Sequence, residues 1–132
     1  MRNYLYAIFT AATILLITSA CSQKVSFSSD VKPILDTHCL KCHDGKGEGS
    51  AKSEFNVVDY NSVLKGTKFG AVVVPGDSSS STLYRMISHQ TDPKIHMPPH
   101  KSATGTEDIN IYLTRNEIET IQNWIDQGAL DN

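Results

Sequence analysis

The sequence lacks an excess of positive charge, internal repeats and low-complexity tracts. It holds 12 Lys and Arg against 14 Asp and Glu in 132 residues, and the basic residues are scattered. Because a phosphate backbone is bound by clustered basic side chains, we expect no nucleic-acid partner. Hydrophobic residues make up 39% and charged residues 20%, values typical of neither a disordered chain nor a multi-span membrane protein. This length favours one compact domain without a second core.

The N-terminal segment contains an uncharged, mostly apolar run, Tyr4 to Ile17, which ends in small residues before Cys21. The run is shorter than the roughly 20 residues of a membrane span, so residues 1–20 are predicted to be a cleaved export signal. The small residues resemble a bacterial lipobox, although Thr18 departs from the usual aliphatic residue. This resemblance implies that Cys21 is acylated; the alternative is an ordinary signal peptide in which Cys21 is incidental.

The residue after Cys21 is Ser22 rather than an aspartate. By resemblance to sorted lipoproteins, this implies the outer membrane. Residues 21–27 are predicted to be a short tether that reaches at most about 25 Å, and residues 28–132 to be the folded domain. The protein is therefore expected in the cell envelope, close to a lipid surface.

Apolar spacing predicts three main helices. The first covers about residues 30–39, and the second carries a stripe over residues 83–87. The third begins with a capping box of Thr114 and Glu117 and ends at Gly128. These elements indicate an all-α fold.

Two further stretches are less regular. Residues 55–60 are too short to assign and are compatible with a brief strand, and residues 61–65 with a short helix ended by Gly66. Residues 89–110 are polar and loop-like. A loop of that length in so small a domain is typically functional.

Residues Cys39 to His43 form a C-x-x-C-H motif, the attachment signature of c-type haem. The thiols of Cys39 and Cys42 are predicted to form thioethers with the vinyl groups of one haem c, and His43 to supply the proximal axial ligand. A structural disulfide leaves His43 unexplained. A thioredoxin-like pair lacks the strand–helix alternation of that fold, and a zinc site lacks enough ligands.

The second axial ligand of a haem iron is predicted to be Met97. This residue directly precedes Pro98 and Pro99, whose restricted φ angles make the segment extended and stiff. A thioether ligand raises the reduction potential relative to a second imidazole. Met86 is the rival by residue type, but its place on a helical stripe favours core packing.

Histidines downstream of the motif provide alternative axial ligands. His96, His89 and an open sixth position remain alternatives to Met97, and His100 is a further candidate in the same loop. His38, His89 and His100 are otherwise expected to be ordinary surface histidines.

The ordered motifs together resemble the planctomycete-type cytochrome c domain over about residues 31–130. The matching blocks are Val31, Lys32, Pro33, Ile34 and Leu35 before the C-x-x-C-H; Val74, Pro75, Gly76 and Asp77 with Ser81, Leu83 and Tyr84; Met97, Pro98 and Pro99; and Trp124, Ile125, Asp126, Gln127, Gly128 and Ala129. The resemblance implies a small helical domain around one haem, with its first and last helices crossing. It implies attachment through Cys39 and Cys42 and axial ligation by His43 and Met97. The segment 100–113 is longer than usual for this family.

These features predict a membrane-anchored c-type cytochrome that exchanges single electrons with redox partner proteins. No nucleophile or paired carboxylates accompany the motif, so an enzyme is not expected. Two alternatives remain open. One is a haem enzyme or gas sensor with an open sixth position, and the other is an accessory subunit of a larger envelope complex.

Overall fold

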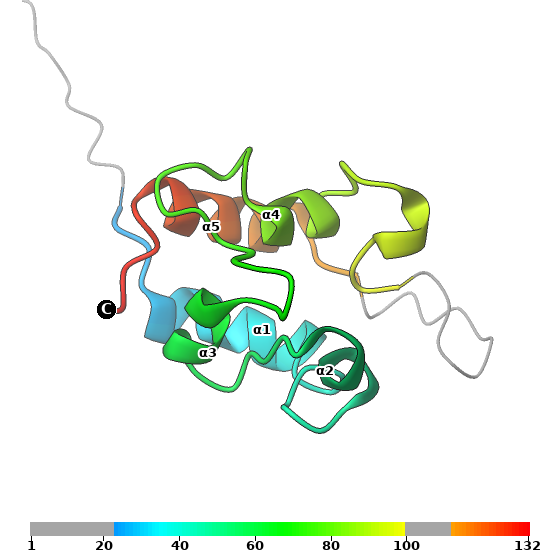
Figure 1. The fold of residues 1–132 in the computed structure, drawn as a ribbon. Coiled ribbons are helices and arrows are strands. Elements are labelled where there is room, and N and C mark those ends of the chain that lie inside the picture. Colours follow the sequence, from blue (N-terminus) through cyan, green and yellow to red (C-terminus); the bar gives the residue numbers. More distant parts are fainter. Residues whose placement is uncertain (1–22, 100–111) are drawn as a thin grey trace, which may run out of the picture.

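The computed structural model describes residues 23–99 and 112–132, and within them the chain is helical with no strand. Figure 1 shows the arrangement of the elements. They are the π-helical turn η1 (Phe27–Val31), α1 (Lys32–His38), α2 (Glu48–Ser53), α3 (Tyr60–Lys65), α4 (Thr82–Ile87), the 3-10 turn η2 (Pro93–Ile95) and α5 (Arg115–Asp126). The all-α fold class is confirmed, and the brief strand considered for residues 55–60 does not form.

Several predicted features lie outside the described residues. These are the export signal over 1–20, the acylation site Cys21, the candidate ligand His100 and most of the segment 100–113. Among the described helices, none combines the length and apolarity that a membrane crossing requires.

The first helical segment begins earlier than the sequence predicts. Ser26 is its N-cap and accepts a hydrogen bond from the backbone N–H of Ser29 at 3.2 Å. The Asp30 carboxylate accepts from the backbone N–H of Ser26 at 2.7 Å. These two bonds satisfy donors that a helix start leaves unpaired. Helical structure therefore begins at Phe27 and continues directly into α1.

The chain is packed against the domain from Val25 onward. The backbone N–H of Val25 donates to the side chain of Gln127 at 2.8 Å, and the Gln127 amide donates to the carbonyl of Gln23 at 3.3 Å. Phe27 is 4% exposed and belongs to the core. The packed domain thus includes part of the segment 21–27, where the sequence predicts a tether.

The capping box at the start of α5 is confirmed. The backbone N–H of Glu117 donates to Oγ1 of Thr114 at 3.3 Å, while the Glu117 carboxylate accepts from the backbone N–H of Thr114 at 2.7 Å. Gly128 follows the helix with φ at 101°, a left-handed conformation that glycine adopts without steric cost. The sequence therefore predicts both ends of this helix.

One hydrophobic core joins the N-terminal and C-terminal helices. Its buried members are Phe27, Val31, Ile34, Leu35, Phe55, Val57, Val63, Val72, Val73, Leu83, Ile87, Ile121, Trp124, Ile125 and Ala129. The rings of Phe27 and Trp124 lie 5.5 Å apart between centroids, and His38 at the other end of α1 contacts Glu117 in the first turn of α5. The first and last helical segments consequently contact each other at both ends, in opposite chain directions (Figure 1).

The turn before α4 is tied to both C-terminal helices. Oγ of the fully buried Ser81 accepts from the backbone N–H of Val74 and donates to the carbonyl of Asp77, both at 2.8 Å. The backbone N–H of Gly76 donates to the carbonyl of Ile125 at 2.7 Å. This block of the family resemblance therefore holds α4 against α5.

Candidate haem-binding site

The C-x-x-C-H motif forms a turn directly after α1. The backbone N–H of Cys39 donates to the carbonyl of Leu35 at 2.9 Å, which extends the helical pattern into the motif. The N–H groups of Cys42 and His43 both donate to the carbonyl of Cys39, at 3.1 and 2.9 Å. The two cysteines and His43 therefore come from one compact, hydrogen-bonded turn.

The two cysteine sulfurs are free thiols in different environments. Cys39 packs against the core, whereas Cys42 is exposed. Burial, with a smaller contribution from Cys42, raises the pKa of the Cys39 thiol to about 12.

The imidazole of His43 is oriented by its Nδ1 atom. Nδ1 lies 3.3 Å from the carbonyl oxygen of Phe55, and the two rings meet edge to face at 5.3 Å. Because a carbonyl only accepts, Nδ1 is the donor and Nε2 keeps the lone pair that a metal requires. Burial lowers the pKa of His43, and the bond to Phe55 partly offsets this effect. A neutral imidazole is the form that ligates iron.

Gly49 lies against the unbonded side of this imidazole. A Cβ atom at position 49 would lie 2.6 Å from Cε1 and 2.7 Å from Nε2 of His43. At Gly47 a Cβ would lie 2.7 Å from the carbonyl oxygen of Cys42. These glycines allow α2 to approach the motif. In the sequence they indicate only a loop, because their role depends on contact with His43 and Cys42.

The two candidate methionines are both half-buried and lie close together. Met97 is half-buried and packs against the hydrophobic core, whereas Met86 on α4 is half-buried without belonging to that packed set. The backbone N–H of Met97 donates to the carbonyl of Met86 at 3.4 Å, so the rivals lie side by side. The core-packing role of Met86 and the axial ligation by Met97 both stay predictions.

The described histidines downstream are engaged with each other. His96 is 7% exposed and its Nε2 lies 3.0 Å from the carbonyl oxygen of Thr91. Its ring stacks on the exposed His89, with centroids 4.4 Å apart and planes 6° from parallel. The bond to Thr91 gives His96 a structural role, which disfavours it as a haem ligand. His89 is exposed, as the sequence predicts.

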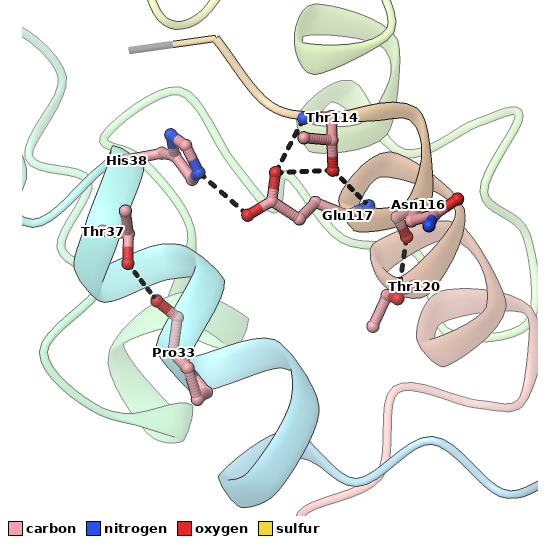
Figure 2. Close-up of polar contacts among 7 residues, drawn as sticks. All are labelled: Pro33, Thr37, His38, Thr114, Asn116, Glu117 and Thr120. Carbon is pink, nitrogen blue, oxygen red and sulfur yellow. Dashed lines mark hydrogen bonds and ion pairs between the residues drawn. The ribbon is translucent and has the colours of Figure 1, made fainter. Parts of the chain in front are cut away.

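His38 is not the surface histidine that the sequence predicts. Its side chain is 6% exposed, and Nε2 lies 3.1 Å from Oε1 of Glu117 (Figure 2). Burial opposes ionisation of Glu117, but hydrogen bonds from Thr114 and the His38 contact outweigh it and lower the pKa of Glu117. The carboxylate is thus an acceptor at neutral pH, which makes His38 the donor.

A surface hollow of about 460 Å³ lies beside the motif turn. Its lining is formed by Lys32, Asp36, Leu40, Lys41, Asp44 and Val58. None of the four predicted haem-contacting residues lines it, so its position does not match the predicted axial geometry. The residues of the motif itself do fit the chemistry of a covalent haem: two free thiols and an imidazole oriented through Nδ1, with Gly49 of α2 lying against its Nε2.

Comparison with known proteins identifies the family of this segment. Residues 39–101 match the family model described as Planctomycete cytochrome C. No curated protein and no solved structure matches the chain. The match begins at the first cysteine of the motif and includes Met97, and it confirms the family resemblance over these residues.

Proposed function

From the match of residues 39–101 to planctomycete cytochrome C, we propose that this protein is a c-type cytochrome that carries one haem and exchanges single electrons with protein partners. The observation that carries the proposal is the motif turn, in which two free thiols and an imidazole oriented through its Nδ1 atom come from five consecutive residues. The haem, when bound, supplies one-electron chemistry at its iron.

Each residue of the motif has a distinct task in this proposal. Cys39 and Cys42 hold the haem covalently, so that it does not dissociate during redox cycling. His43 ligates the iron through Nε2, while the carbonyl of Phe55 keeps Nδ1 protonated and the ring oriented, as second-shell partners of ligand histidines do. Met97 provides the distal thioether, which stabilises ferrous iron and raises the reduction potential.

Two filled axial positions suit an electron carrier. With His43 and Met97 both holding the iron, little would rearrange between its two oxidation states, and small oxidants would find no vacant position. The core contact of Met97 supports this assignment because a packed side chain loses less conformational entropy on ligation than an exposed one. An open sixth position would instead support a haem enzyme or gas sensor.

Export and lipid anchoring are part of the same proposal. They are supported by the apolar run before Cys21, as described for the sequence. Only Ser22 separates Cys21 from Gln23, whose carbonyl is bonded to Gln127. An acyl group on Cys21 would therefore hold the domain within about 7 Å of the lipid surface along the chain. The Cys21→Ala variant should keep its haem and leave the membrane fraction; retention in that fraction would contradict anchoring through this residue.

The function is tested on full-length protein matured with a haem-attachment system. We expect sharp bands in the reduced spectrum, reversible electron exchange with small redox mediators, and no rapid carbon monoxide binding to the reduced form at neutral pH. Rapid, stoichiometric carbon monoxide binding would overturn Met97 ligation and favour the sensor or enzyme. Failure to exchange electrons would favour an accessory subunit with a structural haem.

A further inference from the structure

The carboxylate of Glu117 contacts two different elements with its two oxygens. Oε1 lies 3.1 Å from Nε2 of His38, the last residue of α1. Oε2 accepts from the backbone N–H of Thr114 at 2.7 Å and from its hydroxyl at 2.8 Å. Figure 2 shows Glu117 reaching from α5 toward α1 between these two partners. A capping box requires only the Thr114 contacts, so the His38 contact serves something besides the cap.

The positions of these partners in the chain show which segments the contact connects. His38 is covalently bonded to Cys39, the first residue of the motif. Glu117 belongs to α5, which packs against α4, and the Met86 carbonyl of α4 accepts from the backbone N–H of Met97 at 3.4 Å. One carboxylate therefore joins the residue before the haem-attachment turn to the helix whose neighbour, α4, contacts the predicted distal ligand.

Other polar contacts in the same region remain within one helix. The hydroxyl of Thr37 donates to the carbonyl of Pro33 in α1, and the hydroxyl of Thr120 donates to the carbonyl of Asn116 in α5, both at 2.8 Å (Figure 2). Each joins residues four apart and cannot influence the spacing between helices. They provide matched controls for the contact that does span α1 and α5.

We propose that His38 and Glu117 are a positioning pair that holds the haem-attachment turn in register with the start of α5 and so keeps Met97 on the iron. The inference rests on the proposed function, since it concerns ligation of a bound haem. The His38 side chain is 6% exposed and that of Glu117 is 28% exposed, so water competes weakly for the contact. Hydrogen bonds with a charged partner are also stronger than neutral ones.

The pair is tested by competition for the sixth position of the matured, full-length ferric protein. Added imidazole displaces a thioether ligand, and loss of the far-red ferric band reports the displacement. We expect Glu117→Ala and His38→Leu to lower the apparent imidazole dissociation constant about tenfold, which corresponds to about 1.4 kcal/mol. His38→Gln should retain the wild-type value, because its amide N–H can still donate to Glu117.

The control variants are Thr37→Val and Thr120→Val, which each remove a hydrogen bond within a single helix. Both should leave the imidazole dissociation constant unchanged, even where they lower the thermal midpoint. If the pair served stability alone, the imidazole dissociation constants of all these variants would change in proportion to their thermal midpoints. The comparison of His38→Leu with His38→Gln decides the question if Glu117→Ala does not accumulate as folded protein.

The outcomes separate this inference from the function on which it rests. Wild-type protein without covalent haem or without a far-red band would overturn the proposed ligation and the positioning pair together. Wild-type protein with a normal band, combined with unchanged imidazole affinity in His38→Leu and Glu117→Ala, would overturn the positioning pair alone. An equal effect of His38→Gln and His38→Leu would also overturn it.

Discussion

The two segments predicted to face the haem iron are built differently. On the proximal side, His43 is fixed by backbone bonds: its N–H donates to Cys39, its ring to Phe55, and its carbonyl accepts from the N–H of Val57 at 2.8 Å. On the distal side, one long 3.4 Å bond joins the backbone of Met97 to Met86. Bonds to the motif turn and to the nearby segment 55–57 therefore orient the predicted proximal ligand, whereas packing from other parts of the molecule must hold the predicted distal one.

This difference predicts unequal sensitivity to mutation. Removing a group in the proximal turn should abolish the site, because attachment and ligation share five consecutive residues. Removing a distal group should change ligation while leaving the haem attached, because other core contacts remain. The following experiments test that contrast, beginning with the change expected to have the largest effect.

The double variant Cys39→Ala/Cys42→Ala should lose the covalent haem completely, because both attachment sulfurs are removed. Intact-mass analysis of protein matured in cells measures this loss. Cys21→Ala is the matched control and should retain the added mass, since its sulfur lies outside the motif. Detection of the added mass of haem in the double variant would contradict the assignment of the attachment site. It would also contradict the prediction that removing groups in the proximal turn abolishes the site.

Met97→Ala should retain the haem and lose the far-red ferric band, because no thioether then reaches the iron. Met86→Ala, the neighbouring methionine bonded to Met97 through the backbone, serves as the control and should keep the band. Ultraviolet-visible spectra of the two ferric variants make the comparison. The reverse result would assign the distal position to Met86.

His96→Ala should destabilise the protein by about 1 to 3 kcal/mol, because a buried side chain bonded to the Thr91 carbonyl is removed. The far-red band should persist, since this histidine is not the predicted ligand. His89→Ala removes the exposed partner of the stack and should cost less. Chemical denaturation and spectra of both variants measure these effects, and loss of the band in His96→Ala alone would make His96 the distal ligand.

Glu117→Gln should reduce the loss of stability in acid. The pKa of Glu117 is lowered in the folded protein from the ordinary 4.5. Its carboxylate therefore stabilises the fold above pH 4.5, and this contribution is lost as the pH falls through the lowered value. The difference in thermal midpoint between wild type and variant should therefore shrink as the pH is lowered from 7 into this acid range. Glu119→Gln is the control, because it removes an exposed charge on the same helix. An equally large pH-dependent change in the thermal midpoint difference for that variant would contradict the prediction.

Local sequence patterns predicted several elements correctly. Thr114 and Glu117 form the predicted capping box, and Gly128 follows α5 with a positive φ. These patterns work because the interacting groups are separated by only a few residues. The start of the first helix differs from its predicted position at residue 30, because Ser28 and Ser29 offer the same capping chemistry as Ser26, which is the cap in the structure.

Features that depend on contacts between distant segments were missed. His38 has the sequence context of a surface residue, but α5 covers it and brings Glu117 to its ring, 79 positions away. Gly49 looked like ordinary loop composition because nothing in the sequence shows that it lies against His43. The burial of Met86 and Met97 likewise depends on how α4 and the residues after it pack against the core.

The sequence by itself indicated the resemblance to planctomycete cytochrome C over residues 39–101, the helical class and the C-x-x-C-H motif, because motif spacing and helix periodicity operate over a few residues. Tertiary structure decided which imidazole nitrogen of His43 is available, why residue 49 is a glycine, and which side chain bridges α1 to α5. Those outcomes depend on burial and on contacts between separate segments, from the six positions that separate His43 and Gly49 to the 79 that separate His38 and Glu117, which only the folded chain brings together.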